Sequence, residues 1–344
     1  MKFFVFSPAK FVAIAGLVSL MGLTACTENS QNSQNNQQPS STSNVAQTNA
    51  SKEQTKDAKP APTEVAKTPS NDITIAFATR RDTKDLQSKI DKVTAILSKE
   101  LGSPVKGIVA DETASVEALR ANRANVAFVS GRAALKAEQL SGAKMYLAEV
   151  RADYSGGKSY NSIFVVPENS PLKTLATPQE TLEQLKGKRM AFTSRSSGSG
   201  FIFPVSELVG LKFVDGPDRL DSFFGKVTYG DGYSSALQAV LRDQADVAVV
   251  SEYALLPPWI TAEESKKLRV LHAVPNVPAH GIAIDDSVPA DVREKLINAF
   301  LKLNEAENNE LFRSLYNSTQ LVKVDHEQHL ATMRTAIARA GLKP

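Results

Sequence analysis

The chain is poor in the residues on which crosslinking and much of enzyme chemistry depend. Of its 344 residues, one is cysteine and four are histidine. A single thiol cannot form an intrachain disulfide, so the stability of the protein must come from burial of an apolar core. With so few nucleophiles and metal ligands, the sequence favours a binding protein, and we expect no enzyme activity.

An excess of charge of one sign is also missing. The formal net charge of +3 is too close to zero to suggest a nucleic-acid partner or an acidic partner surface. The sequence contains no GxxxxGK[ST] phosphate loop, no complete dinucleotide-binding fingerprint and no GxSxG nucleophile elbow. These absences argue against a P-loop nucleotide enzyme, a Rossmann dinucleotide enzyme and an α/β-hydrolase.

The apolar run near the start of the sequence is too short to cross a bilayer. Lys2 and Lys10 precede the apolar residues 11–23, whereas a spanning helix needs about 20 apolar residues. The run ends in Leu-Thr-Ala before Cys26, which is the pattern of a lipobox. We therefore expect residues 1–26 to be a lipoprotein signal peptide and lipobox, with a lipid attached at Cys26 as a membrane anchor.

Residues 27–71 contain mostly Gln, Asn, Ser, Thr, Lys and Pro, with almost no large apolar side chain. Such a segment cannot bury enough surface to fold. We expect a disordered tether of about forty-five residues between the lipid and a globular part.

From residue 73 onward, short apolar runs alternate with stretches of helical periodicity. This alternation predicts an α/β fold with mainly parallel sheets flanked by helices. The predicted strands are 73–78, 105–109, 126–129, 144–149, 162–166, 190–192, 227–229 and 247–250. The predicted helices include 85–101, 115–121, 133–139, 182–185 and 234–242.

We expect two lobes, because the chain builds one α/β unit, crosses to a second and returns. Lobe 1 is predicted at residues 72–162 plus 276–344, and lobe 2 at residues 163–275. Ligands of open parallel sheets bind at the carboxyl ends of the strands, so the loops at these ends should meet in one interlobe cleft. This is the architecture of a hinged solute-binding protein.

The stretch 188–204, KRMAFTSRSSGSGFIFP, has the pattern of a strand, a hydroxyl-rich loop and a helix N-terminus. The first amides of a helix have no partner within it, and small residues let an oxyanion approach them. Pro204 has no N–H, so the amides of residues 197–203 are expected to stay available. The loop predicts an oxyanion site, and the alternative is a flexible Ser/Gly loop without a ligand.

The order and spacing of several segments between residue 73 and about residue 303 carry a resemblance to a known family. They resemble the periplasmic phosphonate and phosphite substrate-binding proteins of ABC importers, which have a type II periplasmic-binding-protein fold. The segments are residues 118–128 (ALRANRANVAF), 160–162 (YNS), 185–189 (LKGKR), the hydroxyl-rich loop, 236–240 (ALQAV), 246–248 (DVA) and 277–278 (VP).

Some positions depart from the pattern of that family. The family loop usually reads Ser-Thr-Ser-Gly before its proline, whereas residues 197–200 read SGSG. Tyr233 stands where a histidine is common, Glu112 where a tyrosine is found, and His280 near the position of an acidic residue. The resemblance therefore implies that the oxyanion cradle is kept while the walls of the site differ.

The resemblance implies a solute-binding lipoprotein of an ABC importer in the periplasm or at the cell surface. Such a protein would bind phosphite, phosphate or a phosphonate by hinge closure and deliver it to the permease. No cofactor, metal or nucleic acid is implied, and a monomer is expected. The expected ligand-binding residues are Ser197, Gly198, Ser199, Gly200, Tyr160, Tyr233, Glu252, Ser130, Thr79 and His280.

Several alternatives stay open at the level of sequence. Arg80, Arg81 and Arg195 lie in the predicted loops and could pair with the ligand, or could be solvated surface residues. A sulfonate-like anion is an alternative ligand, because amides and hydroxyls accept any oxyanion. A lipoprotein that senses its ligand without transport is a further alternative. The exact ligand, the permease and the membrane that receives the lipid are not specified by the sequence.

An enzyme is the main rival interpretation, and a metal site near the end of the sequence is the chemistry that it could use. Asp325, His326 and His329 lie at the spacing of one helix face, and with Glu327 they could hold a metal ion. The surrounding stretch is polar, so we predict a solvated helix face there.

Overall fold

The computed structural model describes residues 72–79, 85–151 and 157–344. The described residues all belong to one compact unit. The expected signal peptide, Cys26 and the whole of the expected tether lie outside the described residues. Within the described ranges, no helix has both the length and the hydropathy required to span a bilayer.

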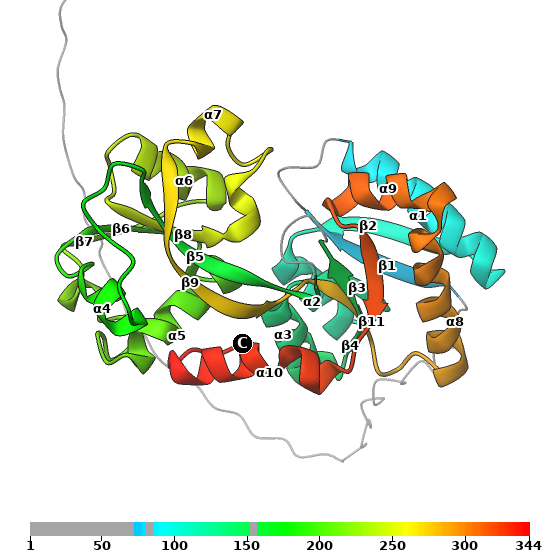
Figure 1. Ribbon diagram of the computed structural model, residues 1–344. Helices are drawn as coiled ribbons and strands as arrows, with labels where there is room; N and C mark the ends of the chain where they lie inside the picture. Colours follow the sequence, from blue (N-terminus) through cyan, green and yellow to red (C-terminus); the bar gives the residue numbers. More distant parts are fainter. Residues whose placement is uncertain (1–71, 80–84, 152–156) are drawn as a thin grey trace, which may run out of the picture. The chain divides into compact units, whose positions relative to one another are not determined.

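The first sheet, here called sheet A, has six strands in the order β11-β4-β10-β3-β1-β2 (Figure 1). β1 pairs in parallel with β2 and β3, whereas β10 pairs antiparallel with β3 and β4, and β11 antiparallel with β4. The strands are β1 (Ile73–Ala78), β2 (Val105–Ala110), β3 (Val126–Val129), β4 (Lys144–Val150), β10 (Gly281–Ile284) and β11 (Gln320–Lys323).

Helices cover both faces of sheet A, as the alternation of side chains along its strands requires. Ile75 and Phe77 are buried in one core cluster with apolar residues of α1, α8 and α9, while Ala76 is buried in another with residues of α2, α3 and α10. The helices are α1 (Leu86–Leu101), α2 (Glu112–Arg120), α3 (Gly131–Ser141), α8 (Ala290–Leu301), α9 (Ala306–Tyr316) and α10 (His326–Arg339).

The second sheet, sheet B, has five strands in the order β7-β6-β8-β5-β9. β6 is parallel to β7 and β8, and β5 is antiparallel to β8 and β9. The strands are β5 (Ser159–Pro167), β6 (Arg189–Phe192), β7 (Lys226–Tyr229), β8 (Val247–Ser251) and β9 (Leu268–Pro278). The longer helices beside it are α4 (Pro178–Glu183), α5 (Phe203–Gly210) and α6 (Tyr233–Leu241), with the short α7 (Ala262–Ser265).

The predicted α/β class with two helix-flanked sheets is confirmed, but the sheets are mixed rather than mainly parallel. β5 and β9 are neighbouring strands of sheet B. The chain passes from sheet A into sheet B along β5 and returns along β9, with Ser159 paired to Pro278. A chain that crosses and returns along neighbouring strands must pair them antiparallel. The proposed lobe boundaries at 162 and 276 fall inside these two strands, and they remain a proposal.

The start of α4 was predicted four residues too late. The helix begins at Pro178 because Thr177 and Glu180 form a capping box, in which each side chain bonds to the backbone of the other. Proline at the first helical position adds to this start signal. The capping pattern was present in the sequence and outweighs the apolar spacing on which the prediction rested.

The C-terminal helix α10 contacts β4 of sheet A and the neighbouring α3, and also β9 of sheet B and the neighbouring α5 (Figure 1). The prediction of a solvated face is wrong for His326, which is 6% exposed and whose Nδ1 accepts the Met145 amide at 2.8 Å. His326 shares a buried stripe with Leu330, Met333 and Ile337. Buried residues spaced three and four positions apart indicate a helix that packs along one face, although the overall composition of this stretch is polar.

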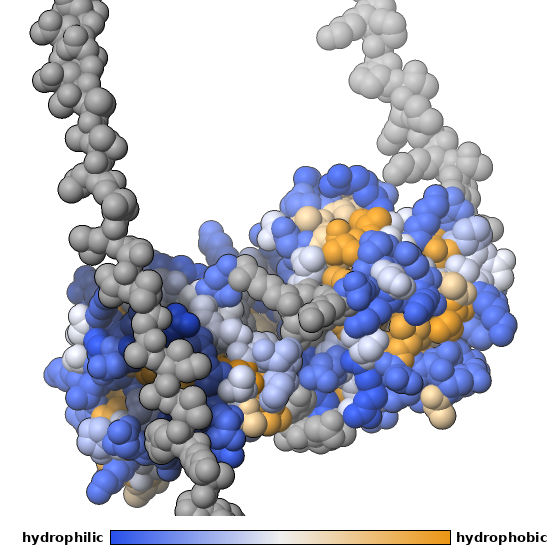
Figure 2. All heavy atoms as spheres, turned by 90° about the horizontal axis from the view of Figure 1, so that it is seen from above, coloured by the Kyte–Doolittle hydropathy of each residue, from blue (hydrophilic) through white to orange (hydrophobic). Residues whose placement is uncertain are grey.

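Most large apolar side chains lie in the three core clusters of the described part. The face seen from above in Figure 2 is mainly hydrophilic, with apolar residues gathered in separate patches. The exposed large apolar residues are Ile108, Val109, Leu140, Leu175, Tyr229, Leu256 and Val270.

Candidate functional site

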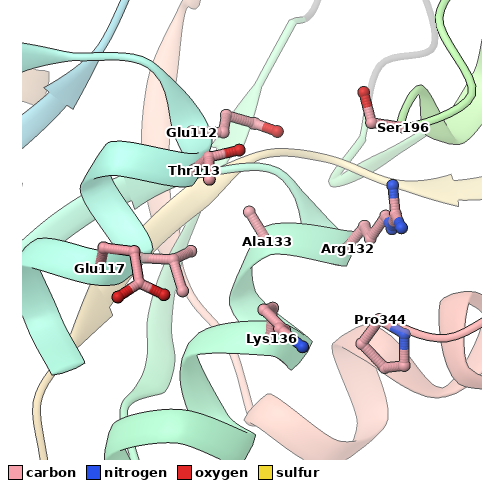
Figure 3. Close-up of a pocket in the computed structure, with 9 residues that line it drawn as sticks. Glu112, Thr113, Glu117, Arg132, Ala133, Lys136, Ser196 and Pro344 are labelled. Carbon is pink, nitrogen blue, oxygen red and sulfur yellow. The ribbon is translucent and has the colours of Figure 1, made fainter. Parts of the chain in front are cut away.

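Three adjoining cavities are lined by loops from both sheets and share Glu112 as a common wall residue. The main cavity encloses about 580 Å³. The loop cavity, of about 180 Å³, shares Ser194, Tyr233 and His280 with the main cavity. The outer hollow encloses about 210 Å³ between α2, α3 and Ser196 (Figure 3). The predicted gathering of strand-end loops therefore takes the form of one connected set of cavities.

The hydroxyl-rich loop is a packed turn that ends in a short π-helix, η1 (Gly198–Ile202). Ser197 caps this helix, and its Oγ accepts the Gly200 amide at 3.0 Å. Gly198 and Ser199 provide the first two amides of η1, which have no acceptor within the helix. Ser197 and Gly198 line the loop cavity. The loop thus presents backbone donors where an oxyanion can reach them.

Gly200 holds the loop close to the end of β6. A Cβ at this position would lie 1.8 Å from Thr193 Oγ1 and 2.8 Å from Thr193 Cβ. Thr193 is buried, and its amide donates to the Gly200 carbonyl at 3.2 Å. The glycine therefore permits a close approach of two backbone segments that any side chain would prevent.

Three tyrosines form the wall between the loop cavity and the main cavity. The hydroxyls of Ser199 and Tyr233 are hydrogen-bonded at 2.8 Å, and those of Tyr233 and Tyr253 lie 3.3 Å apart. The rings of Tyr160 and Tyr253 are 5.2 Å apart. Burial raises the pKa of Tyr160 and Tyr233 well above the ordinary value, and neighbouring tyrosines add to the effect. These hydroxyls therefore stay protonated and able to donate to an anion.

Arg151, which directly follows β4, is a candidate ligand-binding residue that the sequence analysis did not identify. It lines the main cavity and is 5% exposed. Its Nη2 donates to the Tyr316 carbonyl at 3.0 Å and lies 3.3 Å from Glu149 Oε1, and its guanidinium stacks 4.4 Å from the Tyr253 ring centroid. Its Nε and Nη1 are buried and have no hydrogen-bond partner among the described residues.

Unpaired buried donors are rare in native proteins and call for an explanation. Burial disfavours the charge of Arg151, but the carboxylate of Glu149 and the nearby tyrosines outweigh it, so its pKa lies above the ordinary value. A permanently charged guanidinium with free donors is a strong partner for an oxyanion. Arg151 is thus the side chain best placed to bind an anion in the main cavity.

The signal for Arg151 was available in the sequence. It is the first residue after the predicted strand 144–149, at the strand end where ligands bind. The sequence points instead to Arg80, Arg81 and Arg195, because they lie in loops that are expected at the cleft. Arg195 pairs with Asp218 at 2.6 Å and is outside the lining of the three cavities, while Arg80 and Arg81 lie outside the described residues.

His280 lies at the turn between β9 and β10, where it lines both the main and the loop cavity. Its Nδ1 is 3.6 Å from Glu149 Oε1. Glu149 is 2% exposed, and its other oxygen accepts the hydroxyl of Ser318. One buried carboxylate therefore positions both the guanidinium of Arg151 and the imidazole of His280.

Glu112 lies in the first turn of α2, and its carboxylate binds the residue that caps the N-terminus of α3. Its Oε1 accepts the Ser130 amide and its Oε2 accepts the Ser130 hydroxyl, both at 2.9 Å. Figure 3 shows Glu112 and Ser196 on opposite sides of the outer hollow. A carboxylate therefore stands on the wall opposite the hydroxyl-rich loop.

The structure brings most of the sequence-predicted ligand residues to the cavities and leaves three away from them. Those that line a cavity are Thr79, Ser130, Tyr160, Ser197, Gly198, Tyr233 and His280. Ser199 and Gly200 are outside the lining, and Ser199 supports Tyr233. Glu252 is also outside it, because its carboxylate accepts the backbone and side-chain amides of Asn161 at 2.9 and 2.7 Å.

His326 of α10 belongs to an ion-pair network outside the lining of these cavities, whereas His329 Nε2 lies 3.0 Å from the Ala279 carbonyl oxygen. Within the described residues, one group has metal-ligand spacing, made of Glu138, His326 and Glu327. Arg334 pairs with Glu138 at 2.7 Å and with Glu327 at 3.1 Å. Burial would raise the pKa of Glu138, but hydrogen bonds from Arg334 and His326 keep it lowered. The guanidinium of Arg334 therefore supplies the positive charge that a metal ion would otherwise bring to these carboxylates.

Comparisons with known proteins place this geometry in context. A family model described as "ABC transporter, phosphonate, periplasmic substrate-binding protein" matches residues 75–329. The phosphonates-binding periplasmic protein of Escherichia coli is 24% identical over 207 residues, which cover 60% of this chain and 58% of that protein. The phosphate-import protein PhnD of Mycolicibacterium smegmatis is 25% identical over 237 residues, which cover 66% of this chain and 70% of that protein.

A solved structure shares the fold. The crystal structure of a binding protein component of an ABC phosphonate transporter from Pseudomonas aeruginosa aligns with a TM-score of 0.60 at 19% identity. The alignment covers 78% of this chain and 86% of the other. This similarity confirms the predicted two-lobed α/β fold of type II periplasmic binding proteins.

Proposed function

The chain belongs to the family of periplasmic substrate-binding proteins of ABC phosphonate transporters, and from this premise we propose that it captures a small phosphorus oxyanion for import. Phosphite, phosphate and phosphonates are the proposed ligand class. The protein acts as a binding protein, without catalysis, and delivers its ligand to the permease in the membrane. Its proposed location is the periplasm or the cell surface.

The observation that carries this proposal is the pair of unpartnered donors on Arg151 in a cavity that adjoins the loop cavity, which Ser197 and Gly198 line at the start of η1. Arg151 extends from sheet A, and η1 follows a strand of sheet B. An anion that bonds to both sides gains its full set of contacts only when the two sides are close. Ligand binding therefore shifts the population toward the closed form, which is the form a permease would recognise.

The size and lining of the main cavity favour a phosphonate with an organic substituent. The cavity of about 580 Å³ falls in the range typical of small-molecule sites, about 300–1,000 Å³. Phe128, Tyr253 and Trp259 contribute aromatic surface to its wall. An organic group bound to phosphorus would contact this surface while the oxyanion meets Arg151 and the loop amides.

The double substitution Ser197→Ala and Ser199→Ala tests the role of the loop. Ser197 orders the turn through the Gly200 amide, and Ser199 holds the Tyr233 hydroxyl. We expect binding of the best phosphorus oxyanion to weaken by at least about tenfold, because each of the two lost hydrogen bonds, which order the turn and hold the Tyr233 donor, contributes roughly 0.5–1.5 kcal/mol. Calorimetric titration of the wild-type protein and the double variant with phosphate, phosphite, methylphosphonate and 2-aminoethylphosphonate measures the loss of affinity. Unchanged affinity would show that the loop does not contribute to ligand binding.

We also propose that residues 1–26 are a lipoprotein signal and that Cys26 carries a lipid anchor, joined to the folded part by the tether 27–71. The apolar run before Cys26 and its lipobox pattern support this proposal. We expect the substitution Cys26→Ser to move the mature protein from the membrane fraction to the soluble fraction of cells. Immunoblotting of both fractions measures the change, and a mature Cys26→Ser protein that stays membrane-bound would contradict the anchor.

A further inference from the structure

A carboxylate on the wall of an oxyanion site needs an explanation. Glu112 lines all three cavities, together with Ser194 and Tyr233 in the main and loop cavities. A fully deprotonated oxyanion at this place would face another acceptor of the same charge. Like charges brought together out of water are unfavourable, so this wall disfavours any anion that brings no proton to it.

The hydrogen bonds of Glu112 leave acceptor capacity unused. Each of its oxygens accepts one bond from Ser130, at 2.9 Å in both cases. An ionised carboxylate offers about four lone-pair sites, so roughly two remain. Because both bonds go to the same residue, the carboxylate is held in place by α3. Glu112 is therefore a fixed acceptor in the lining of the loop cavity, which Gly198 also lines.

Phosphorus and sulfur oxyanions differ in the one group that such an acceptor requires. The second ionisation of a phosphate ester lies near pH 6, so phosphorus oxyanions carry a P–OH in part of their population near neutral pH. Sulfonates and sulfate have lost their protons under these conditions. Only the oxyanion group of a phosphorus compound can itself place a hydroxyl donor against Glu112 while presenting charged oxygens to Arg151 and the loop.

We propose that Glu112 is the specificity-determining residue of this site, and that it accepts a hydrogen bond from the P–OH of a singly protonated phosphorus oxyanion. This inference rests on the proposed function and narrows its ligand class. Glu112 admits protonated phosphonates and rejects sulfonates and sulfate of the same shape. The hydroxyl-rich loop supplies affinity for oxyanions in general, while Glu112 supplies the distinction between phosphorus and sulfur.

Matched ligand pairs test the proposal. Calorimetric titrations would compare methylphosphonate with methanesulfonate, and 2-aminoethylphosphonate with 2-aminoethanesulfonate, for the wild-type protein and for Glu112→Gln. The amide of glutamine can still accept a bond from Ser130, so the variant keeps a tie to α3. Glu100→Gln, at an exposed position on α1, is the matched control.

We expect the wild-type protein and Glu100→Gln to prefer each phosphonate over its sulfonate by at least about a hundredfold, as a site built around a ligand hydroxyl does. In Glu112→Gln the preference should fall by at least about tenfold, because glutamine can donate to a sulfonate oxygen. Wild-type protein that binds both members of a pair equally would overturn the inference and leave the oxyanion site intact.

The pair of amine-bearing ligands distinguishes a hydrogen bond from the P–OH to Glu112 from a contact between Glu112 and the ligand amine. If Glu112→Gln weakened only 2-aminoethylphosphonate and left methylphosphonate unchanged, Glu112 would bind the ligand amine, and the proposed role would be wrong. If the wild-type protein bound none of the four compounds, the proposed function itself would fail, and this inference with it.

Discussion

Replacing Arg151 by methionine should abolish oxyanion binding and lower the free energy of unfolding by about 3–5 kcal/mol, the range found when one partner of a buried ion pair is removed. Glu149 is 2% exposed and would lose the guanidinium that lies 3.3 Å from its Oε1. The Tyr316 carbonyl would also lose a donor. Urea unfolding measures the stability, and calorimetric titration with phosphorus oxyanions measures the binding.

A second variant separates the loss of ligand binding from the loss of stability. In Arg151→Met combined with Glu149→Gln, the buried charge is removed, so we expect most of the lost stability to return while binding stays absent. Arg195→Met is the control, because Arg195 is half exposed and pairs with Asp218 outside the cavities. Binding restored in the Arg151→Met and Glu149→Gln double variant would show that Arg151 does not anchor the ligand.

Replacing Gly200 by alanine should remove binding as well, for a steric reason. The new Cβ would lie 1.8 Å from Thr193 Oγ1, with Thr193 Cγ2 and Cβ at 2.7 and 2.8 Å, so rotation of one side chain cannot relieve the contact. Overpacking of this kind costs about 1–3 kcal/mol and shifts the backbone. The shift would move Gly198, and with it the first amide of η1, from the wall of the loop cavity. Unfolding and titration experiments on the same preparation measure both changes.

Gly216→Ala provides the comparison for Gly200→Ala. No heavy atom lies within 4 Å of a Cβ built at Gly216. We expect this variant to bind oxyanions as the wild-type protein does and to lose little stability. A Gly200→Ala protein that behaved like Gly216→Ala would mean that the loop tolerates displacement and that its backbone donors are not the cradle.

The fold could be predicted from the sequence because its strands and helices have strong local periodicity. The strand at 126–129 was predicted with its observed bounds, and α1 was misplaced by one residue at its start. β11 was missed, since four residues between two helices carry no periodic signal long enough to recognise. The mixed pairing of the sheets was also missed, because strand direction depends on the crossing of the chain between sheets rather than on local pattern.

The candidate site could be predicted where its residues are contiguous, and less well where tertiary contacts decide. The loop at 197–200 was identifiable because small residues and a proline surround a helix start. Glu252 was expected in the cleft but bonds to Asn161, a partner 91 positions away in sequence. Arg151 owes its free donors to the geometry of Glu149 and Tyr316, which sequence spacing does not reveal.

A crystal structure of the protein with methylphosphonate bound is the most direct test of the central claim. The account predicts phosphonate oxygens within about 2.7–3.2 Å of the Gly198 and Ser199 amides and of Arg151 Nε or Nη1, so that one ligand contacts residues of both sheets. Methylphosphonate bound outside these cavities, or held without contact to either Arg151 or the loop amides, would contradict it.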